Sequence, residues 1–183
     1  MKHTGPQTIE TPPLLLRRFT AADAQSMYEN WASDEHVTRY MAWPRHESPA
    51  DSEKVLTQWV QDYEKPDFYE WAIVLKDLGQ PIGNIEELSF DDYVQKANLG
   101  YSIGRAFWGK GIMPEALKAV IDFLFDEVGL NRVEACHDAR NPNSGKVMAK
   151  CGMTHEGTMR QWAWTNAGIC DTCNYGILKS DRK

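Results

Sequence analysis

The fold is decided by Gly104-Arg-Ala-Phe-Trp-Gly-Lys-Gly-Ile-Met-Pro-Glu-Ala-Leu117, the junction between an apolar strand and the longest helix of the chain. Alternating apolar residues over 97–103 predict the strand, and apolar residues at helical spacing over 116–128 predict a helix of about 15 residues. Between them, Gly109 and Gly111 allow backbone N–H groups to approach a ligand, and the helix N-terminus adds partial positive charge. The junction suits a phosphate or pyrophosphate; an ordinary β–α bend is the alternative.

Two nucleotide-binding motifs come close to this junction but are incomplete. The spacing Gly104-x4-Gly109-Lys110 is within one residue of a P-loop, yet Gly111 stands where a magnesium-binding Ser or Thr is required. The dinucleotide motif G-x-G-x-x-G is also broken, because Pro114 takes the place of its last glycine. A nucleotide-dependent kinase or NTPase therefore stays only as a third hypothesis.

Composition limits the remaining classes. A chain of 183 residues with net charge −6 predicts one globular domain without nucleic acid as an obligate partner. No apolar run approaches the roughly 20 residues of a membrane span, and no signal-peptide core is present, so we expect a cytoplasmic protein. Residues 1–11 are polar and predict a loose arm. Cys170 and Cys173 would face opposite sides of a strand, and we expect no metal.

The order of the predicted elements is a strand, a helical stretch, three strands, a helix, a strand, a helix and two strands, which is that of a mixed α/β (α+β) sheet. Strands are expected at 14–19, 69–75, 81–90, 95–103, 132–137, 153–164 and 169–178. Helices are expected at 21–31, at 34–41, from 49 to before 65, after the glycine turn, and at 143–150. No linker or internal repeat divides the chain.

Several short motifs in this order resemble those of the GCN5-related N-acetyltransferase (GNAT) superfamily, closest to its RimJ/RimL-like branch. They are Trp108-Gly-Lys-Gly-Ile-Met-Pro-Glu-Ala116, Asn141-Pro-Asn-Ser144, Lys150-Cys-Gly-Met153, Glu156-Gly-Thr-Met-Arg160, and Asp171 with Tyr175-Gly-Ile-Leu178. The resemblance implies a single acetyltransferase domain over 1–183, built on a mixed, mostly antiparallel sheet flanked by helices. Its fourth and fifth strands would splay apart to form a slot.

The resemblance implies acetyl-coenzyme A as co-substrate and assigns residues to it. Backbone N–H groups of the glycine turn would bind the pyrophosphate, and unpaired backbone of the fourth strand would bind the pantetheine arm and the thioester. The implied cofactor-binding residues are Tyr101, Ser102, Ile103, Trp108, Gly109, Lys110, Gly111, Ile112, Met113, Asn141 and Ser144. Trp108 replaces the Gln or Arg usual in the family, and Met113 replaces the last small residue of the motif and is expected to crowd the start of the helix.

Direct transfer of an acetyl group to an amine needs a neutral amine and a stabilised leaving thiolate. Many family members protonate the thiolate with a Tyr, whose position here is held by Met148, so Ser144 is the candidate acid. Glu86 is the candidate base, because it can reach the slot from the third strand, and Tyr101 is a further catalytic candidate. Glu87 and His137 remain open alternatives.

The acceptor side is expected between the N-terminal helical pair and the last hairpin. Tyr40, Trp43, Arg160 and Trp162 are the candidate substrate-binding residues there, with Trp164 nearby. The leading hypothesis is an N-acetyltransferase acting on a protein N-terminal α-amine or a small-molecule amine. A non-catalytic acyl-coenzyme A-binding module is the alternative from another class, and a homodimer is left open.

Overall fold

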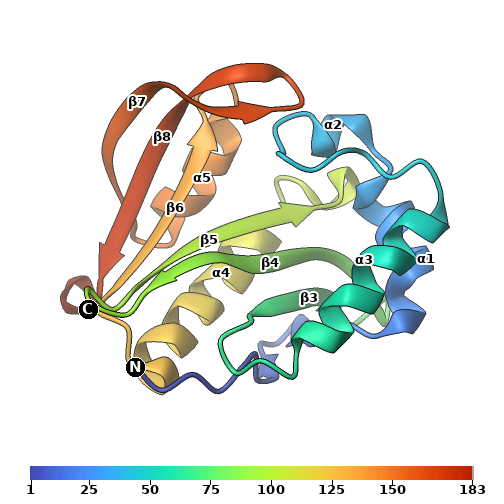
Figure 1. Cartoon of the computed structure of the whole chain (residues 1–183), viewed down its shortest axis with the longest axis horizontal. Coiled ribbons are helices and arrows are strands. Elements are labelled where there is room, and N and C mark those ends of the chain that lie inside the picture. The colour runs from blue at the N-terminus through green and yellow to red at the C-terminus, as the bar shows by residue number, and fades with distance from the viewer. Residues whose placement is uncertain (183) are drawn as a thin grey trace.

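The structure, a computed structural model, describes residues 1–182 as one eight-stranded sheet with helices on both faces (Figure 1). The strand order is β1-β2-β3-β4-β5-β6-β8-β7. Every neighbouring pair is antiparallel except β5 and β6, which run parallel. The strands are β1 Ile9–Glu10, β2 Leu14–Arg17, β3 Glu70–Leu75, β4 Gln80–Asp91, β5 Lys96–Ile103, β6 Arg132–Asp138, β7 Thr154–Thr165 and β8 Gly168–Leu178.

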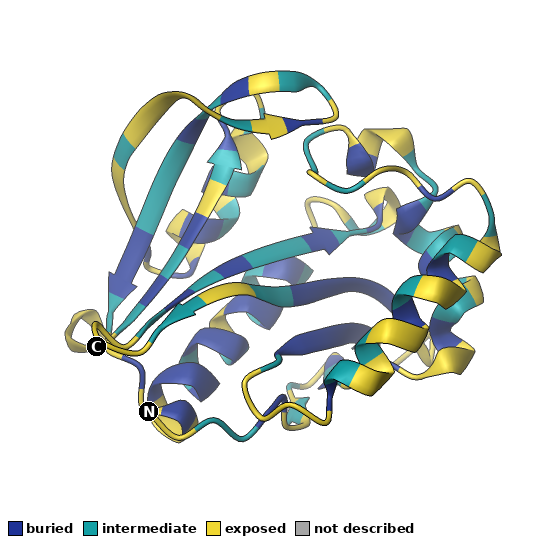
Figure 2. Cartoon of the chain, in the orientation of Figure 1, coloured by how far each residue is buried: buried dark blue, intermediate teal, exposed yellow. Residues whose placement is uncertain are grey.

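Two groups of helices cover the two faces of the sheet. Helices α4 (Ile112–Phe123) and α5 (Pro142–Lys150) cover one face, and α1 (Ala24–Met27), α2 (Glu35–Thr38) and α3 (Pro49–Asp62) lie against the other. Burial follows this arrangement: β3 and much of β4 are buried, whereas β7 at the outer edge is mostly exposed (Figure 2). Among the described residues, no helix is long and apolar enough to cross a membrane.

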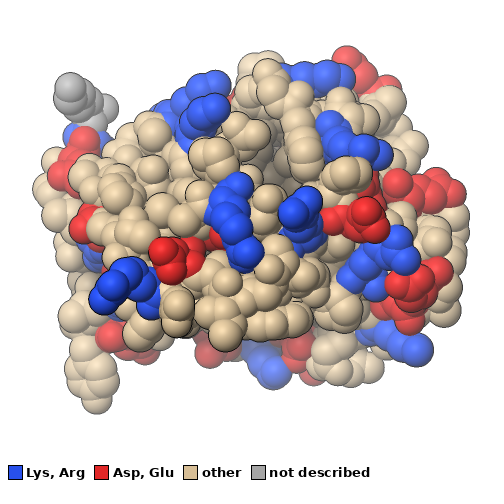
Figure 3. Space-filling view, turned by 90° about the horizontal axis from the view of Figure 1, so that it is seen from above, with Lys and Arg blue, Asp and Glu red and all other residues tan. Residues whose placement is uncertain are grey.

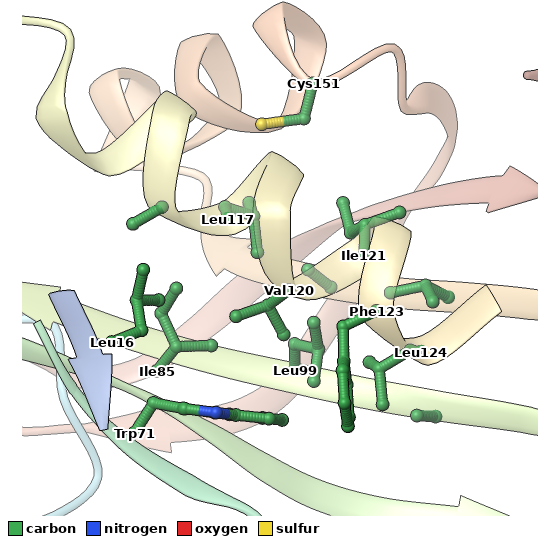
Figure 4. Packing of buried hydrophobic residues seen from close by; sticks show 14 of the residues in the cluster. Leu16, Trp71, Ile85, Leu99, Leu117, Val120, Ile121, Phe123, Leu124 and Cys151 are labelled. Atoms are coloured by element: carbon green, nitrogen blue, oxygen red, sulfur yellow. The ribbon is translucent and has the colours of Figure 1, made fainter. Parts of the chain in front are cut away.

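Side-chain alternation along the central strands builds two apolar layers. Trp71, Ile85 and Leu99 point to the α4 face, where they pack against Leu117 and Val120 of that helix (Figure 4). The residues between them point to the other face, because successive strand residues face opposite sides. Residues that pack against α4 therefore alternate along each central strand with residues that face away from it.

The strands β5 and β6 splay apart, as the family resemblance predicts. Their parallel pairing runs from Lys96 with Arg132 to Leu99 with Ala135 and then stops. Beyond that point β5 continues to Ile103 paired with β4 alone, and β6 continues to Asp138 paired with β8 alone. The two strands diverge in Figure 1, and the prediction of a splayed pair in a mixed, mostly antiparallel sheet is confirmed.

The prediction of a loose N-terminal arm is wrong. The backbone N–H of Lys2 donates to the Val128 carbonyl at 3.0 Å, and that of Gly5 donates to the Pro66 carbonyl at 2.8 Å. The indole N–H of the buried Trp71 in turn donates to the Gln7 carbonyl at 2.9 Å. Because a buried polar group needs a partner, the arm is held by the aromatic residues that it covers.

The helices differ from expectation in detail. The expected helix over 21–31 is a run of 3₁₀, α and π turns from Ala21 to Ala32, and the one over 34–41 shortens to α2. The helix after the glycine turn reaches Val128 through a terminal π turn, Leu124–Val128, and then ends at Gly129 with φ 82°. The local sequence signals therefore locate these helix ends only approximately.

Candidate active site

The glycine turn before α4 requires glycine for its backbone conformation. Gly109 has φ 74° and Gly111, the N-cap of α4, has φ 80° and ψ −1°. A Cβ at either position would meet no atom within 4 Å, so side-chain space is not the constraint. Left-handed φ costs other residues free energy, and two such residues close together turn consecutive N–H groups to one side.

This turn presents a run of free donors. In the described part of the chain, the backbone N–H groups from Gly109 to Met113 donate to no backbone acceptor. Two of them open the first turn of α4, where intrahelical acceptors are missing and the helix dipole is positive. The Lys110 ammonium adds charge beside the turn, 5.6 Å from the ring centre of Phe107. The arrangement fits a pyrophosphate held without a metal-binding hydroxyl.

The two departures from the family motif have structural explanations. The Met113 side chain is only 4% exposed and belongs to the core under α4, so it leaves the ligand side clear. The indole N–H of Trp108 donates to the Ile103 carbonyl at 2.9 Å. Trp108 therefore ties the glycine turn to the last residue of β5.

Hydrogen bonds at the two ends of β5 show to which side its backbone N–H and C=O groups point. The Gln95 carbonyl accepts from Asn131 and Arg132 on the β6 side, whereas the Gly104 N–H donates to Ile82 of β4. Because backbone groups alternate along a strand, those of Tyr101 and Ile103 point toward the slot. The Ile103 carbonyl accepts a hydrogen bond from the Trp108 indole. The other backbone groups of Tyr101 and Ile103 remain available to a ligand.

Ser102 is turned away from the slot, unlike the role expected for it. By the same alternation its backbone groups face β4, where it pairs with Asn84. Its side chain is 5% exposed and its hydroxyl donates to the Asn84 amide oxygen. Ser102 thus supports the slot from behind rather than lining it.

Tyr101 crosses from β5 to α5 on the cofactor side. Its hydroxyl lies 2.9 Å from the Ser144 Oγ and 2.9 Å from the Ser144 carbonyl oxygen. Burial raises the pKa of Tyr101 well above its ordinary value, so the hydroxyl remains protonated at any working pH. The two hydroxyls predicted from sequence to be catalytic are therefore in direct contact.

At the N-terminus of α5, the side chain of Asn141 is available to bind a ligand. Asn141 is the N-cap, but its side chain makes no capping hydrogen bond, while its N–H donates to the Asp138 carbonyl at 2.7 Å. An N-cap amide normally caps its own helix. Met148 lies further along α5. It is 1% exposed and packs in the core instead of reaching the slot.

Glu86 reaches the slot from the face opposite the cofactor residues. It pairs with Gly100 across β4 and β5, and its Oε1 would lie 3.1 Å from a Cβ at Gly100. Since Gly100 follows the last residue of β5 paired with β6, the carboxylate lies over the strand where the slot opens. Burial raises the pKa of Glu86, and burial with Asp67 and Glu86 nearby raises that of Glu87 to about 7.

A buried carboxyl behind Glu86 was missed by sequence reasoning. Glu70 of β3 is 1% exposed, pairs directly with Glu86, and accepts a hydrogen bond from the Asn84 amide at 3.0 Å. Burial first, and Glu86 second, raise the pKa of Glu70 well above its ordinary value. The available signal was an isolated Glu between Tyr69 and Trp71 in an otherwise apolar strand.

The candidate acceptor residues lie in two separate places. Tyr40 and Trp43 follow α2, in the loop that meets the turn of the β7–β8 hairpin. Arg160 and Trp162 lie in β7, which is separated from β6 by β8. The pairing of β7 with β8 is interrupted between Met159 and Ala163, and Arg160 lines a cavity there.

His137, the remaining candidate base, makes structural contacts. The His137 Nδ1 lies 2.8 Å from the Asp138 carbonyl oxygen, and the ring packs beside Tyr175 and against Gly145 of α5. Among residues 1–182, no group of three His, Cys, Asp or Glu side chains is placed to hold a metal ion.

Known proteins with similar sequence and structure share this architecture. The family described as "Acetyltransferase (GNAT) domain" matches residues 13–154. The chain is 29% identical over 171 residues to the uncharacterized N-acetyltransferase YoaA of Bacillus subtilis (strain 168), covering 93% of this chain and 96% of that protein. Over 64 residues it is 38% identical to the ribosomal protein uS5-alanine N-acetyltransferase of Escherichia coli (strain K12), covering 35% of this chain and 33% of that protein.

A solved structure gives the same fold. RimL, the ribosomal L7/L12 α-N-protein acetyltransferase in complex with coenzyme A, superposes with a TM-score of 0.85 over 96% of this chain and 100% of that one, at 18% identity. Such a likeness shows the fold alone, while the family match covers most of the chain. This chain belongs to the GNAT family of acetyltransferases and is an acyltransferase enzyme, and the proteins it is similar to include ribosomal-protein N-acetyltransferases, consistent with the resemblance to the RimJ/RimL-like branch.

Proposed function

We propose that the enzyme transfers acetyl directly from acetyl-coenzyme A to a primary amine, either a protein N-terminal α-amine or a small-molecule amine. The observation that carries this proposal is the placement of groups around the splayed end of β5. Tyr101 and Ser144 lie on the face covered by α4 and α5, and Glu86 lies on the opposite face. Donor and acceptor can then meet in the slot from opposite sides, without an acetylated enzyme intermediate.

The glycine turn and the β5 backbone hold the donor. Free N–H groups from Gly109 to Met113 bind the pyrophosphate, and Asn141 binds the pantetheine arm with its uncommitted amide. The free N–H groups of Tyr101 and Ile103 then face the thioester carbonyl. Donors fixed in this way stabilise the negative charge that develops on that oxygen during attack.

Glu86 acts as the base. An amine reaches the site as an ammonium ion, and it must lose a proton before its nitrogen can attack the carbonyl carbon. The raised pKa of Glu86 brings this carboxylate closer to the pH at which a base accepts a proton efficiently. The proton passes from the ammonium to Glu86, directly or through one water molecule.

The Ser144 hydroxyl supplies a proton to the leaving group. As the new C–N bond forms and the C–S bond breaks, the sulfur takes the electron pair and accepts the Ser144 proton, while the attacking nitrogen releases its surplus proton to water, which returns a proton to Ser144. The Tyr101 hydroxyl, 2.9 Å away, keeps its own proton and donates a hydrogen bond to the serine oxygen during this exchange. Because a thiol with a pKa near 8.5 leaves readily, this step needs only modest assistance.

The test is acetyl-coenzyme A turnover against a panel of lysine-free peptides with free N-termini and small primary amines, followed by free-thiol release and by the mass of the acceptor. We expect thiol release that depends on the amine and a mass increase of one acetyl group. The core position of Met148 favours one competing function, a non-catalytic acyl-coenzyme A-binding module. That module would bind the cofactor tightly and release no thiol with any amine.

A further inference from the structure

The pairing of β4 with β5 contains a bulge just beyond the candidate base. Glu87 pairs with Leu99, but the next pair joins Ser89 to Asn98, so Leu88 is an extra residue without a partner on β5. A bulge of this kind changes the direction in which a side chain points, and bulges are common next to active sites. The regular alternation of side chains along β4 is thus interrupted at Leu88, two residues after the base.

The bulge places the Leu88 side chain beside that of Glu86. A Cβ at Gly100, which pairs with Glu86 across the two strands, would lie 3.1 Å from the Glu86 Oε1 and 3.3 Å from the Leu88 Cδ1. Both side chains thus lie over the same glycine. Leu99 packs against α4 and successive strand residues face opposite sides, so this contact lies on the face of the sheet away from α4.

Gly100 is required here for space rather than for backbone conformation. Its φ lies outside the left-handed region, whereas the two neighbouring side chains leave no room for an added methyl group at normal contact distances. Leu99 is the last residue of β5 that pairs with β6, so Gly100 is the first residue of the part where the slot opens. The surface beside Glu86 therefore consists of bare β5 backbone at Gly100 and the apolar side chain of Leu88.

Leu88 is also exposed to solvent. It is 54% exposed, although residues 81–85 of the same strand are buried (Figure 2). A single exposed leucine is ordinary on a protein surface. Here, however, the exposure coincides with the bulge, with the missing side chain at Gly100 and with the position of the base. Together these observations favour a contact with a ligand over an ordinary surface position.

Charge on the upper surface gives little basis for selecting an acceptor. Figure 3 shows that Lys and Arg side chains occur there together with Asp and Glu side chains, with uncharged areas between them. The arginines that follow β5 and β6 are both paired, Arg105 with Asp34 at 2.9 Å and Arg140 with Asp138 at 2.7 Å. Selection is therefore expected from contacts close to the reacting nitrogen.

We propose that Leu88 is a specificity-determining residue, and that the enzyme prefers a primary amine whose amine-bearing carbon carries a hydrocarbon group. This inference rests on the proposed function, in which Glu86 is the base. When the acceptor nitrogen lies at the Glu86 carboxylate, the adjacent carbon can lie over Gly100 and its substituent against Leu88. Contact with a hydrocarbon group removes apolar surface of both partners from water, whereas a hydrogen atom or a charged group gains nothing there. For a polypeptide acceptor, this substituent is the side chain of the first residue.

The chain offers matched substitutions for a test. Leu88→Ala removes most of the apolar contact, whereas Leu88→Met keeps the volume and the apolar character of the side chain. Leu78 is the control position, because it is 50% exposed and lies in the turn between β3 and β4, outside the pairing with β5.

The experiment measures kcat/KM for acetyl transfer to two pairs of acceptors: leucinamide with glycinamide, and two lysine-free peptides that differ only in an N-terminal Leu or Gly. In the wild-type enzyme we expect the Leu acceptor of at least one pair to be used about tenfold better. Leu88→Ala should lower that preference by about fivefold, and Leu88→Met and Leu78→Ala should keep it. The Michaelis constant for acetyl-coenzyme A should stay close to wild type in all three variants.

A preference that Leu88→Ala leaves unchanged, or a wild-type enzyme that uses Leu and Gly acceptors equally, would overturn the inference and leave the proposed function intact. Absence of amine-dependent thiol release with these acceptors and with the amine panel would instead overturn the proposed function. If Leu88→Ala does not fold, Leu88→Gln keeps a side chain of similar size and replaces its apolar end by an amide. It should lower the preference as well, and an unchanged preference in that variant would contradict the inference.

Discussion

The hydroxyl of Tyr101 on β5 and the Oγ of Ser144 on α5 lie 2.9 Å apart, and the same Tyr101 hydroxyl lies 2.9 Å from the Ser144 carbonyl oxygen. A phenol has one hydrogen, so it donates to one of these oxygens at a time. When it donates to the carbonyl, the serine hydroxyl can donate elsewhere; when it donates to Oγ, its hydrogen bond stabilises the serine oxygen after the serine has given up its proton. In the proposed mechanism, this pair supplies the acid function that the core residue Met148 cannot.

Removing either hydroxyl should slow turnover modestly. We expect Ser144→Ala to lower kcat by about tenfold, below the usual range for a general acid because the thiol leaves well. Tyr101→Phe should lower kcat by less, because it removes only the hydroxyl that supports the serine. Steady-state kinetics with separate Michaelis constants for both substrates check this, with the fully exposed Tyr93→Phe as control. A Tyr101→Phe loss larger than that of Ser144→Ala would reverse the two roles.

Replacing Glu86 should affect turnover far more than replacing its neighbour. Glu86→Gln is expected to lower kcat/KM for the amine by about 100-fold, since the base is lost while the shape is kept. Glu87 is the next residue in the strand and faces the other side of the sheet. The kcat/KM of Glu87→Gln for the amine should therefore stay within a few-fold of wild type. Both carboxyls have a raised pKa, which makes the pair a matched comparison.

The pH profile separates these two carboxyls further. Protonation removes the base, so the wild-type kcat/KM for the amine should fall on the acid side at a pH above the ordinary range of glutamate. That acid limb should vanish in Glu86→Gln and persist in Glu87→Gln. If the limb instead disappeared with Glu87, whose pKa is about 7, the assignment of the base would be wrong.

Much of this site could be predicted from sequence because its signals are local. The glycine turn is an example: positive φ at Gly109 and Gly111 favours glycine, and glycine can be read directly from the sequence. Ser102 was assigned to the cofactor because it belongs to the right strand, yet the side of a strand that a backbone faces depends on its pairing partners. Two residues in one strand can therefore share a motif and have opposite roles.

Glu70 and Leu88 could not be found in this way. The importance of Glu70 comes from pairing with Glu86, sixteen residues away on another strand. Leu88 is brought beside Glu86 only by the bulge in the pairing of β4 with β5. Likewise, residues 1–11 read as a loose arm because hydrogen bonds from Trp71 and to Val128 leave no periodic pattern in the arm itself.

Two substitutions of Gly111 should weaken cofactor binding to different degrees. Gly111→Ala imposes a Cβ at φ 80°, which costs about 1 kcal/mol and shifts the turn, so the dissociation constant for coenzyme A should rise by roughly fivefold. Gly111→Glu adds a negative charge where the pyrophosphate binds and should abolish binding. Isothermal titration measures both, and Lys118→Ala, on an exposed face of α4, is the control. Unchanged binding in Gly111→Glu would remove this turn from the cofactor site.

Glu70→Gln should stabilise the protein, and increasingly so as pH rises. The pKa of Glu70 is well above its ordinary value in the folded state, so folding takes up a proton when the pH exceeds about 4.3, the unfolded value. Wild-type stability therefore falls with pH from that point until the folded carboxyl itself ionises. Glutamine avoids this cost and can still accept the Asn84 hydrogen bond, while Glu86 and Glu87 remain in both proteins.

Thermal unfolding between pH 4 and pH 8 measures the effect. The two proteins should have similar Tm near pH 4, and the advantage of Glu70→Gln should then grow by roughly 3–5 °C for each unit by which the folded pKa is raised. The exposed Glu53→Gln is the control. Turnover of Glu70→Gln at neutral pH should stay near wild type, because an amide resembles the protonated carboxyl. A Tm difference that shrinks with rising pH would mean that Glu70 is ionised in the folded protein.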